Sequence, residues 1–178
     1  MDLTPGWIHE HGINLHLDYM ESETGSILEA GSAAGRLFNY LHREKPKWKY
    51  TGVDDWKNEI VYLQTDLDKG YFEDELGERV TEKMFKHYCP FADVHNMRFE
   101  EYDTDELYDI VSIGQISKKI NWRETFTKAF KLCKDDGYVI GRNIKHPYYG
   151  SIIEETIKDY NKVGQVWGYF VLKKDYGI

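Results

Sequence analysis

Short apolar runs that suit buried strands alternate with helical patterns along most of this 178-residue chain. The expected strands are residues 26–31, 49–54, 97–102, 108–114 and 137–141, and a closing stretch at 166–172 that is one strand or two joined at Gly168. Amphipathic helical spacing occupies the intervals between them. Such alternation requires right-handed crossovers. We therefore expect an α/β fold, a three-layer sandwich with a mostly parallel sheet of seven strands or slightly fewer.

One domain is expected over residues 1–178, because a chain of this length can bury one core. Residues 1–24 form an N-terminal extension with two possible structures. Ile13, Leu15 and Leu17 alternate as in a strand, whereas Leu17 and Met20 suit a helix. Residues 56–90 read as a helical insertion between the second and third strands, with a long helix expected from residue 71 to residue 88.

Composition narrows the possible partners and location. Lys+Arg 23 against Asp+Glu 31 gives 23 − 31 = −8, which argues against nucleic acid or an anionic membrane as a partner. No apolar run approaches the roughly 20 residues that span a bilayer. The first residues lack a signal-peptide pattern, and the two cysteines form neither a disulfide framework nor a metal-type pair. We therefore expect a cytoplasmic protein.

The first predicted strand leads into a loop of small residues that begins at Glu29. Ligands of parallel α/β sheets bind at the carboxyl ends of the strands, so this loop is the first candidate site. Gly31, Ser32 and Gly35 would let a ligand approach the backbone closely. The loop lacks the Gly-x-Gly-x-x-Gly pattern of dinucleotide-binding dehydrogenases. The anionic Glu29 favours a ligand with a cationic amine over one with a pyrophosphate; a turn without any ligand is the alternative.

Acidic residues follow the next two predicted strands. Asp54 and Asp55 end the second strand, where a carboxylate can accept the hydroxyl groups of a ribose, and Trp56 can offer a flat face to adenine. A helix cap and a core role are the alternatives for these residues. Asp103, at the end of the third predicted strand, could accept a hydrogen bond from an exocyclic amine. The surrounding stretch is acid-rich, so a solvated acidic surface explains it equally well.

Four segments in this order resemble the motifs of the class I S-adenosylmethionine-dependent methyltransferases. Residues 27–35 resemble the first motif, 52–54 the acidic second motif, 108–111 the fourth-strand motif, and 132–140 the approach to the fifth strand. In the last of these, Asp136 stands where a glycine is usual. The resemblance extends from about Ser26 to the end of the chain and implies a Rossmann-like sheet with S-adenosylmethionine as cofactor.

The resemblance also implies a set of cofactor-binding residues. Glu29 would face the methionine part of the cofactor above Gly31, Ser32 and Gly35; Asp54 would bind the ribose, Asp55 and Trp56 would lie beside the adenine, Asp103 and Thr104 near its amine, and Gly114 and Gln115 near the methyl group. A narrower resemblance is to a small-molecule branch of this family, in which some members bind a divalent metal through acids after the fourth and fifth strands. Here residues 114–117 and Arg142-Asn143 replace those acids, so no metal ligands are predicted.

The general base is the least specified part of the expected site. His146 and Lys118 lie on the loops after the fifth and fourth strands and are the candidate catalytic residues, although an exposed histidine and a solvated lysine are the plainer interpretation. His9, His11 and His16 are close in sequence, but their spacing is not that of a tetrahedral metal site.

The expected activity is metal-independent methyl transfer to oxygen or nitrogen of a small molecule or peptide. Two alternatives remain open at this point. One is a non-catalytic domain that binds S-adenosylmethionine or regulates a partner. The other is a nicotinamide-dependent oxidoreductase, which the missing Gly-x-Gly-x-x-Gly pattern disfavours.

Overall fold

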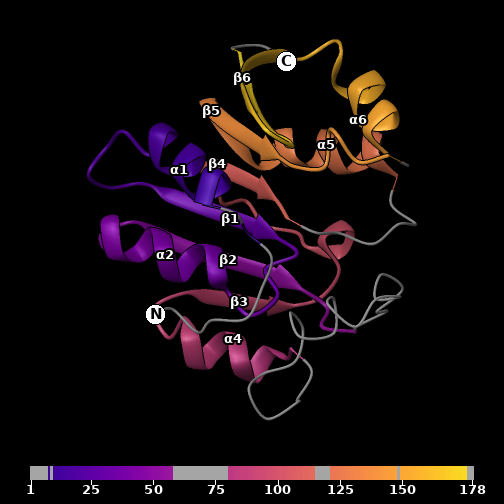
Figure 1. Cartoon of the computed structure of the whole chain (residues 1–178). Coiled ribbons are helices and arrows are strands. Elements are labelled where there is room, and N and C mark those ends of the chain that lie inside the picture. Colours follow the sequence, from indigo (N-terminus) through magenta and orange to yellow (C-terminus); the bar gives the residue numbers. More distant parts are fainter. Residues whose placement is uncertain (1–7, 9, 58–79, 115–120, 148, 176–178) are drawn as a thin grey trace.

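One sheet of seven strands runs through the protein in the order β3-β2-β1-β4-β5-β7-β6 (Figure 1). The computed structural model describes residues 8, 10–57, 80–114, 121–147 and 149–175. The strands are β1 Ser26–Ala30, β2 Lys49–Asp54, β3 Asp93–Asn96, β4 Tyr108–Ile113, β5 Cys133–Gly141, β6 Asn161–Val166 and β7 Tyr169–Lys173. The helices are α1 Glu10–Tyr19, α2 Arg36–Glu44, α4 Glu82–Tyr88, α5 Trp122–Leu132 and α6 Gly150–Ile157, with a 3₁₀ turn η1 at Phe99–Glu101.

The first five strands are parallel, and the last two form an antiparallel hairpin at one edge. One strand of this hairpin, β7, also pairs with β5, again in the antiparallel direction. The expected α/β fold with a mostly parallel sheet of seven strands is therefore confirmed. Of the two possibilities for the closing stretch, the structure has two strands joined at Gly168, and β6 begins five residues earlier than expected, at Asn161.

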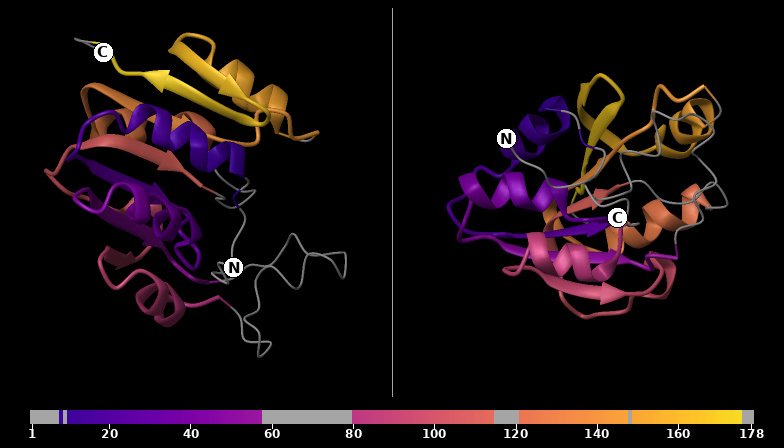
Figure 2. Two further views of the ribbon diagram at one scale, coloured as in Figure 1. Left: turned by 60° about the vertical axis from the view of Figure 1, so that its left-hand side comes forward. Right: turned by 60° about the horizontal axis from the view of Figure 1, so that its bottom comes forward.

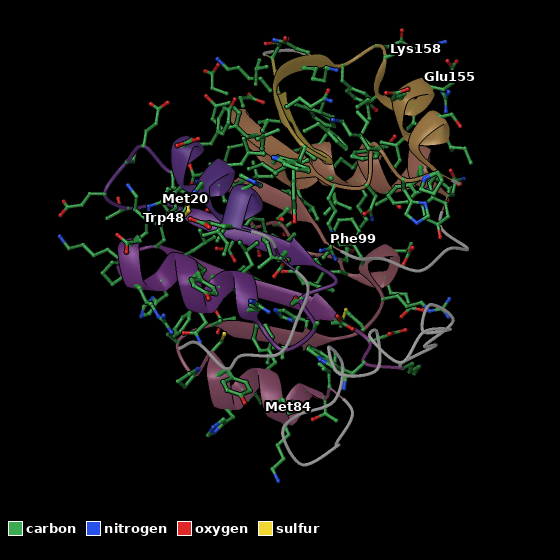
Figure 3. The ribbon with its side chains drawn as sticks, in the orientation of Figure 1. Met20, Trp48, Met84, Phe99, Glu155 and Lys158 are labelled. Atoms are coloured by element: carbon green, nitrogen blue, oxygen red, sulfur yellow. The ribbon has the colours of Figure 1, made fainter. Side chains whose placement is uncertain are left out.

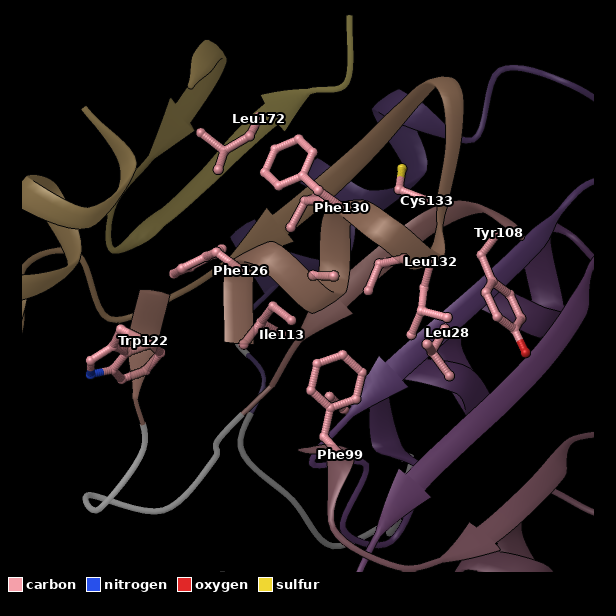
Figure 4. Packing of buried hydrophobic residues seen from close by; sticks show 14 of the residues in the cluster. Leu28, Phe99, Tyr108, Ile113, Trp122, Phe126, Phe130, Leu132, Cys133 and Leu172 are labelled. Atoms are coloured by element: carbon pink, nitrogen blue, oxygen red, sulfur yellow. The ribbon is translucent and has the colours of Figure 1, made fainter. Parts of the chain in front are cut away.

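Helices cover both faces of the sheet (Figure 2). Ile27, Ile110 and Ile140 pack on the face that α1 and α2 cover, together with Met20 and Trp48, which Figure 3 shows side by side. The alternate residues of the same strands pack on the opposite face, against α5 and α6. Figure 4 shows this second cluster, which includes Leu28, Ile113, Phe126, Phe130 and Leu172. Central parallel strands buried on both faces explain the continuous apolar runs in the sequence.

The amino ends of three strands are fastened by one carboxylate. Asp109 Oδ2 accepts hydrogen bonds from Ser26 N at 2.7 Å and from Ser26 Oγ at 2.9 Å. Lys134 Nζ of β5 also donates to it at 2.9 Å. These contacts fix the relative positions of β1, β4 and β5, and they leave the carboxyl ends of the same strands for the loops described below.

Two expectations for the region between β2 and β4 are wrong. The third strand is Asp93–Asn96, and the stretch expected to be that strand contains the 3₁₀ turn instead. β3 pairs with β2 alone at the edge of the sheet, so it needs no apolar run to be buried. The expected helix from residue 71 to residue 88 is not continuous, because α4 begins at Glu82, where the Thr81 side chain caps it by accepting from Met84 N at 3.3 Å. Residues 58–79 of the expected insertion lie outside the described residues.

The N-terminal extension contains a helix, which settles the choice that the sequence left open. α1 buries Ile13 and Leu15 together with His16 against the sheet. None of the helices in the described part of the chain is long and apolar enough to cross a bilayer.

Candidate functional site

The carboxyl ends of β1 and β4 form the switch point of the sheet. The chain proceeds from β1 outward to β2 and β3 and then returns to β4 on the other side of β1. The loops after these two strands therefore run in opposite directions. Ligands of open α/β sheets bind between such loops. The loop that follows β1, residues 31–35, is the centre of the candidate site.

This loop has a tight backbone in which three residues adopt positive φ angles: 79° at Gly31, 49° at Ala33 and 80° at Gly35. Gly31 N donates to Val53 O at 2.8 Å, and Ser32 Oγ donates to Glu29 O at 3.0 Å. The left-handed turns bring the loop close over the sheet edge, with no large side chain within it. The result is a cradle that is lined mainly by backbone.

Gly114, at the end of β4, lies directly against this loop. Its N–H donates to Ala30 O at 2.7 Å. A Cβ atom at this position would lie 2.7 Å from the carbonyl oxygens of both Ala30 and Gly31, which leaves no room for a side chain. The structure thus brings Gly114, one of the residues predicted to lie near the methyl group, into contact with the glycine loop. Gln115 and Lys118 lie outside the described residues.

Glu29 is a buried carboxylate at the foot of the loop, with 7% of its surface exposed. Its Oε2 atom has no hydrogen-bond partner among the described residues. Burial raises the pKa of Glu29 to about 8, the Arg142 guanidinium lowers it, and the neighbouring Asp54 raises it further. A buried carboxylate with an unused oxygen is costly unless a donor or a cation completes it.

Arg142 is a buried cation that interacts electrostatically with Glu29, and it directly follows β5 in the chain. Gly141 pairs with Phe170, so the antiparallel register sets Arg142 opposite Tyr169 of β7, with which it forms a side-chain hydrogen bond. Burial lowers the pKa of Arg142, while Tyr169 and Glu29 counteract that effect. In the sequence, Arg142 was identified only as a replacement for a metal ligand, and its contact with Tyr169 was not predicted. A charged residue immediately after an apolar strand was the available signal.

His16 and Ser112 form a second polar pair on the same face of the sheet. His16 Nε2 lies 2.9 Å from Ser112 Oγ, and His16 Nδ1 lies 2.6 Å from Gly12 O. Ser112 pairs with Glu29 across the β1–β4 register, so the two polar pairs are neighbours beneath α1. The sequence could not have revealed this pair, because it depends on a helix that the sequence left ambiguous.

The acids after β2 close the other side of the loop. Asp54 Oδ2 accepts from Ala33 N at 2.9 Å, and Asp54 Oδ1 accepts from Trp56 N at 2.9 Å. Trp56 Nε1 donates back to Ala33 O at 2.8 Å, so its indole lies over the glycine loop. Burial raises the pKa of Asp54, and hydrogen bonds from the backbone N–H groups of Ala33, Trp56 and Asp55 lower it. Asp55 accepts from Lys57 N at 3.1 Å. Asp54 and Trp56 thus contact the glycine loop, and Asp55 lies between them in the chain.

Asp103 and Thr104 do not lie at the end of a strand, so the reason given for their role was wrong. They follow the 3₁₀ turn; Asp103 is exposed, and Thr104 Oγ1 accepts from Glu106 N at 3.1 Å. The end of β3 is Asn96, which pairs with Asp54 at the end of β2. Asn96 therefore occupies the strand-end position that had been predicted for Asp103. Only one apolar residue lies in β3, so the sequence carried no strand signal there.

His146 lies on the loop after β5, at the same edge of the sheet. The imidazole of His146 stacks on Tyr149 with ring centroids 4.1 Å apart, and the backbone N–H of His146 donates to Asn143 O at 2.9 Å. Across the described ranges, no group of three or more His, Cys, Asp or Glu side chains is arranged to hold a metal ion. His16 already uses both ring nitrogens, and His11 stacks on Trp167.

Comparisons with known proteins identify the architecture. The sequence matches no protein-family model and no curated protein sequence. The structure is similar to the N-methyltransferase NodS from Bradyrhizobium japonicum WM9 in complex with S-adenosyl-l-homocysteine, with a TM-score of 0.60 and 14% identity over 93% of this chain and 86% of that chain. It is similar to a precorrin-6y C5,15-methyltransferase from Geobacter metallireducens GS-15, with a TM-score of 0.62 and 9% identity over 95% and 90% of the two chains.

A third solved structure, the ribosomal protein L11 methylase from Lactobacillus delbrueckii subsp. bulgaricus, has a TM-score of 0.62 and 10% identity over 97% of this chain and 82% of that chain. These three proteins are named for different methyl acceptors, so the shared architecture does not fix the acceptor. In this chain, the strand order and the antiparallel strand β7 occur together with the glycine loop that follows Glu29 at the switch point. The chain has the fold of the class I S-adenosylmethionine-dependent methyltransferases, as its sequence resemblance predicted.

Proposed function

We propose that this protein transfers a methyl group from S-adenosylmethionine to an oxygen or nitrogen of a small molecule or peptide. The observation that carries the proposal is Glu29, a buried carboxylate with an Oε2 atom that has no partner among the described residues, beneath a loop of left-handed residues. A ligand with a cationic amine satisfies that oxygen, and the amino group of S-adenosylmethionine is such a cation. NodS, which has this fold, was crystallised with S-adenosyl-l-homocysteine.

Other residues around the loop suit the remaining parts of the cofactor. In this proposal Gly31, Ser32 and Gly35 support the methionine moiety, and Asp54 binds the ribose. Asp55 and Trp56 border the adenine, and Asn96 lies near its amine in place of Asp103 and Thr104. Gly114 and Gln115 border the methyl group. Asp54 accepts from the backbone N–H groups of Ala33, Trp56 and Asp55, which leaves one of the four lone pairs of its carboxylate to accept a ribose hydroxyl.

The chain's part in the reaction is chiefly positioning. When bound, S-adenosylmethionine supplies an electrophilic methyl group on a positively charged sulfur. The acceptor oxygen or nitrogen forms the new bond to the methyl carbon, the carbon–sulfur bond breaks with its electrons going to sulfur, and the acceptor proton goes to a base or to water. Holding the acceptor in line with the methyl group accounts for most of such an acceleration. His146 and Lys118 remain the candidate bases.

We propose a metal-independent reaction for a structural reason. Arg142 and Asn143 follow β5, and Gly114 ends β4, so the described ends of these strands offer no carboxylate. Mg²⁺ binds through oxygen ligands, chiefly carboxylates, and a cationic guanidinium at this place repels it. Turnover that is unchanged by a chelator is the expected result.

Calorimetric titration with S-adenosylmethionine, S-adenosylhomocysteine and NADH tests the cofactor. We expect binding of both sulfur nucleotides and none of NADH. Asp54→Ala should abolish or greatly weaken binding, whereas Asp93→Ala, an exposed acid at the start of the edge strand β3, should bind like the parent protein. Equal binding by all three proteins would place the site elsewhere, and failure of the parent protein to bind either sulfur nucleotide would contradict the proposal.

A non-catalytic domain is the second candidate, and one observation favours it. Arg142 already places a cation near Glu29, where the proposed function expects the amine of the cofactor. Turnover assays against a panel of hydroxyl and amine acceptors distinguish the two candidates. Cofactor binding without transfer to any acceptor would support the non-catalytic domain.

A further inference from the structure

The turn between β6 and β7 has a tryptophan where a glycine is expected. Val166 pairs with Tyr169, so only Trp167 and Gly168 form the loop. The favoured two-residue hairpin turns have a positive φ at the first of these two positions, where Gly, Asn or Asp usually stands. The φ angle of Trp167 is 53°, an outlier for a bulky residue. Strain of this kind is concentrated at functional positions.

Packing does not explain the choice of tryptophan. Its side chain is 65% exposed, the largest exposure among the large hydrophobic residues that the structure describes as exposed. One face of the indole stacks on the ring of His11, in the first turn of α1, with centroids 5.2 Å apart and planes 14° from parallel. A stack on one side together with this exposure leaves the rest of the indole accessible to a ligand.

The turn lies at the edge of the sheet that carries the candidate site. Gly168 O accepts a hydrogen bond from Ile144 N, on the loop that leaves the carboxyl end of β5. The next residue, Tyr169, hydrogen-bonds Arg142, and Arg142 interacts electrostatically with Glu29. A continuous set of contacts therefore connects the turn with the carboxylate that we assign to the cofactor amine.

A second aromatic group includes residues of the β5 exit loop itself. His146 stacks on Tyr149, and the Trp122 ring lies 6.4 Å from that of Tyr149. Figure 4 shows Trp122 at the start of α5, at the margin of the apolar cluster. The hairpin turn thus contacts the loop after β5 through Gly168, and Trp122 contacts the same loop through Tyr149, at the carboxyl ends of the parallel strands.

We propose that Trp167 and His11 form an aromatic wall of the acceptor site, and that the methyl acceptor is a small molecule with a planar aromatic ring. This inference rests on the proposed methyl transfer and specifies its substrate class. A planar ring stacks on an indole face, and such contacts contribute a preference of about two- to tenfold beyond the area that they bury. Trp167 positions the acceptor and takes no part in the proton transfer.

Two matched pairs of probes test the acceptor class. One pair is 4-hydroxybenzoate and cis-4-hydroxycyclohexanecarboxylate; the other is tyramine and 4-(2-aminoethyl)cyclohexanol. Each pair keeps the charged group and the position of the hydroxyl group, and exchanges a flat phenol ring for a puckered alcohol ring. Binding is measured by calorimetry, with the protein alone and with the protein saturated with S-adenosylhomocysteine. We expect the aromatic member of at least one pair to bind several-fold more tightly than its saturated partner.

The variants Trp167→Gly and Trp167→Phe test whether the preference for the aromatic probe depends on the wall formed by Trp167 and His11. Glycine adopts a φ of 53° without strain, so Trp167→Gly should not lower the thermal unfolding midpoint, yet it should remove the aromatic preference by about two- to tenfold. Trp167→Phe should keep most of the preference. Leu107→Ala is the matched control. Leu107 is another exposed apolar residue, but it precedes β4 and so lies at the amino ends of the parallel strands, away from the candidate site.

Three outcomes overturn the inference: no aromatic preference in the parent protein, the same preference in Trp167→Gly, or a parent protein that self-associates through Trp167. Sedimentation of the parent and the Trp167→Gly variant detects the last of these. The nucleotide titration of the parent protein separates this inference from the proposed function. Tight binding of S-adenosylhomocysteine without an aromatic preference rejects the acceptor class alone, whereas absence of nucleotide binding rejects the proposed function itself.

Discussion

The imidazole of His16 connects α1 to the middle of the sheet, with Nε2 lying 2.9 Å from Ser112 Oγ. Its other nitrogen, Nδ1, lies 2.6 Å from Gly12 O. A carbonyl oxygen only accepts, so Nδ1 carries a proton. Burial lowers the pKa of His16 to about 4, so the ring is neutral at pH 7 and its Nε2 accepts from the serine hydroxyl.

Stability should therefore fall in mild acid because of His16. An unfolded histidine titrates near pH 6.5, so the unfolded state binds more protons than the folded state between pH 6.5 and about 4. The contribution is fully present above pH 6.5 and is lost as the pH falls toward 4. Urea unfolding at pH 7 and pH 5 should show a loss larger by about 2 kcal/mol in the parent protein than in His16→Gln, which cannot titrate.

His87→Gln provides the control for this prediction, because His87 is exposed on α4. Its loss of stability between the two pH values should equal that of the parent protein. Equal losses in all three proteins would show that His16 does not titrate differently in the folded state. Both glutamine variants leave the other titrating groups unchanged, so their contribution cancels in the comparison.

Cofactor affinity should rise with pH because of Glu29. Its pKa of about 8 means that the carboxyl group is largely protonated at pH 7 in the free protein. An adjacent ammonium group favours the carboxylate, so binding releases a proton. The affinity for S-adenosylhomocysteine should increase by up to about tenfold per pH unit below pH 8. Calorimetry at pH 7 in buffers with different ionisation enthalpies measures the released proton directly.

Glu29→Gln separates this carboxyl group from other titrating residues. Glutamine keeps the size of the side chain but can neither release a proton nor offer a negative charge to an ammonium group. Its affinity should be lower than that of the parent protein, and calorimetry should detect no proton release. An affinity of the parent protein that is constant from pH 6 to pH 8 would show that Glu29 does not face the amine.

The parts of the site predicted from the sequence are those that local patterns determine. Glu29 lies near the end of a buried central strand and the loop to Gly35 follows it, and such a strand must be a largely apolar run that ends where the chain turns. Asp54 is the last residue of the neighbouring strand, so its contact with Ala33 results from the parallel order of β1 and β2.

The missed parts depend on contacts between distant segments. Ser112 meets His16 across 96 positions of the chain, and Arg142 meets Tyr169 only because β7 pairs with β5 in the antiparallel direction. No local periodicity in the sequence predicts either of these two contacts. Asn96 was missed for a different reason: an edge strand with polar, exposed residues resembles a loop in sequence.

Gly35 should tolerate no side chain. Its φ of 80° is left-handed, and a Cβ atom there would lie 2.4 Å from Cys89 Sγ. Strain from the backbone and overpacking against the buried sulfur should together lower the free energy of unfolding of Gly35→Ala by about 2–4 kcal/mol. Urea unfolding measures this loss, and the double variant with Cys89→Ala should recover only the part due to overpacking. Full recovery in the double variant would show that the backbone conformation costs nothing.

Asp136 offers a comparison of two substitutions at one backbone conformation. It stands where the resemblance leads one to expect a glycine, and its φ of 63° is indeed left-handed. Its half-exposed carboxylate pairs with Lys173 at 3.3 Å, a contact that stabilises little at the surface. Asp136→Gly and Asp136→Ala both remove this pair, but only alanine retains a Cβ atom that disfavours the left-handed region. The glycine variant should therefore be more stable than the alanine variant by about 1 kcal/mol in urea unfolding. Equal stabilities, or a more stable alanine variant, would mean that residue 136 is not held in this conformation in solution.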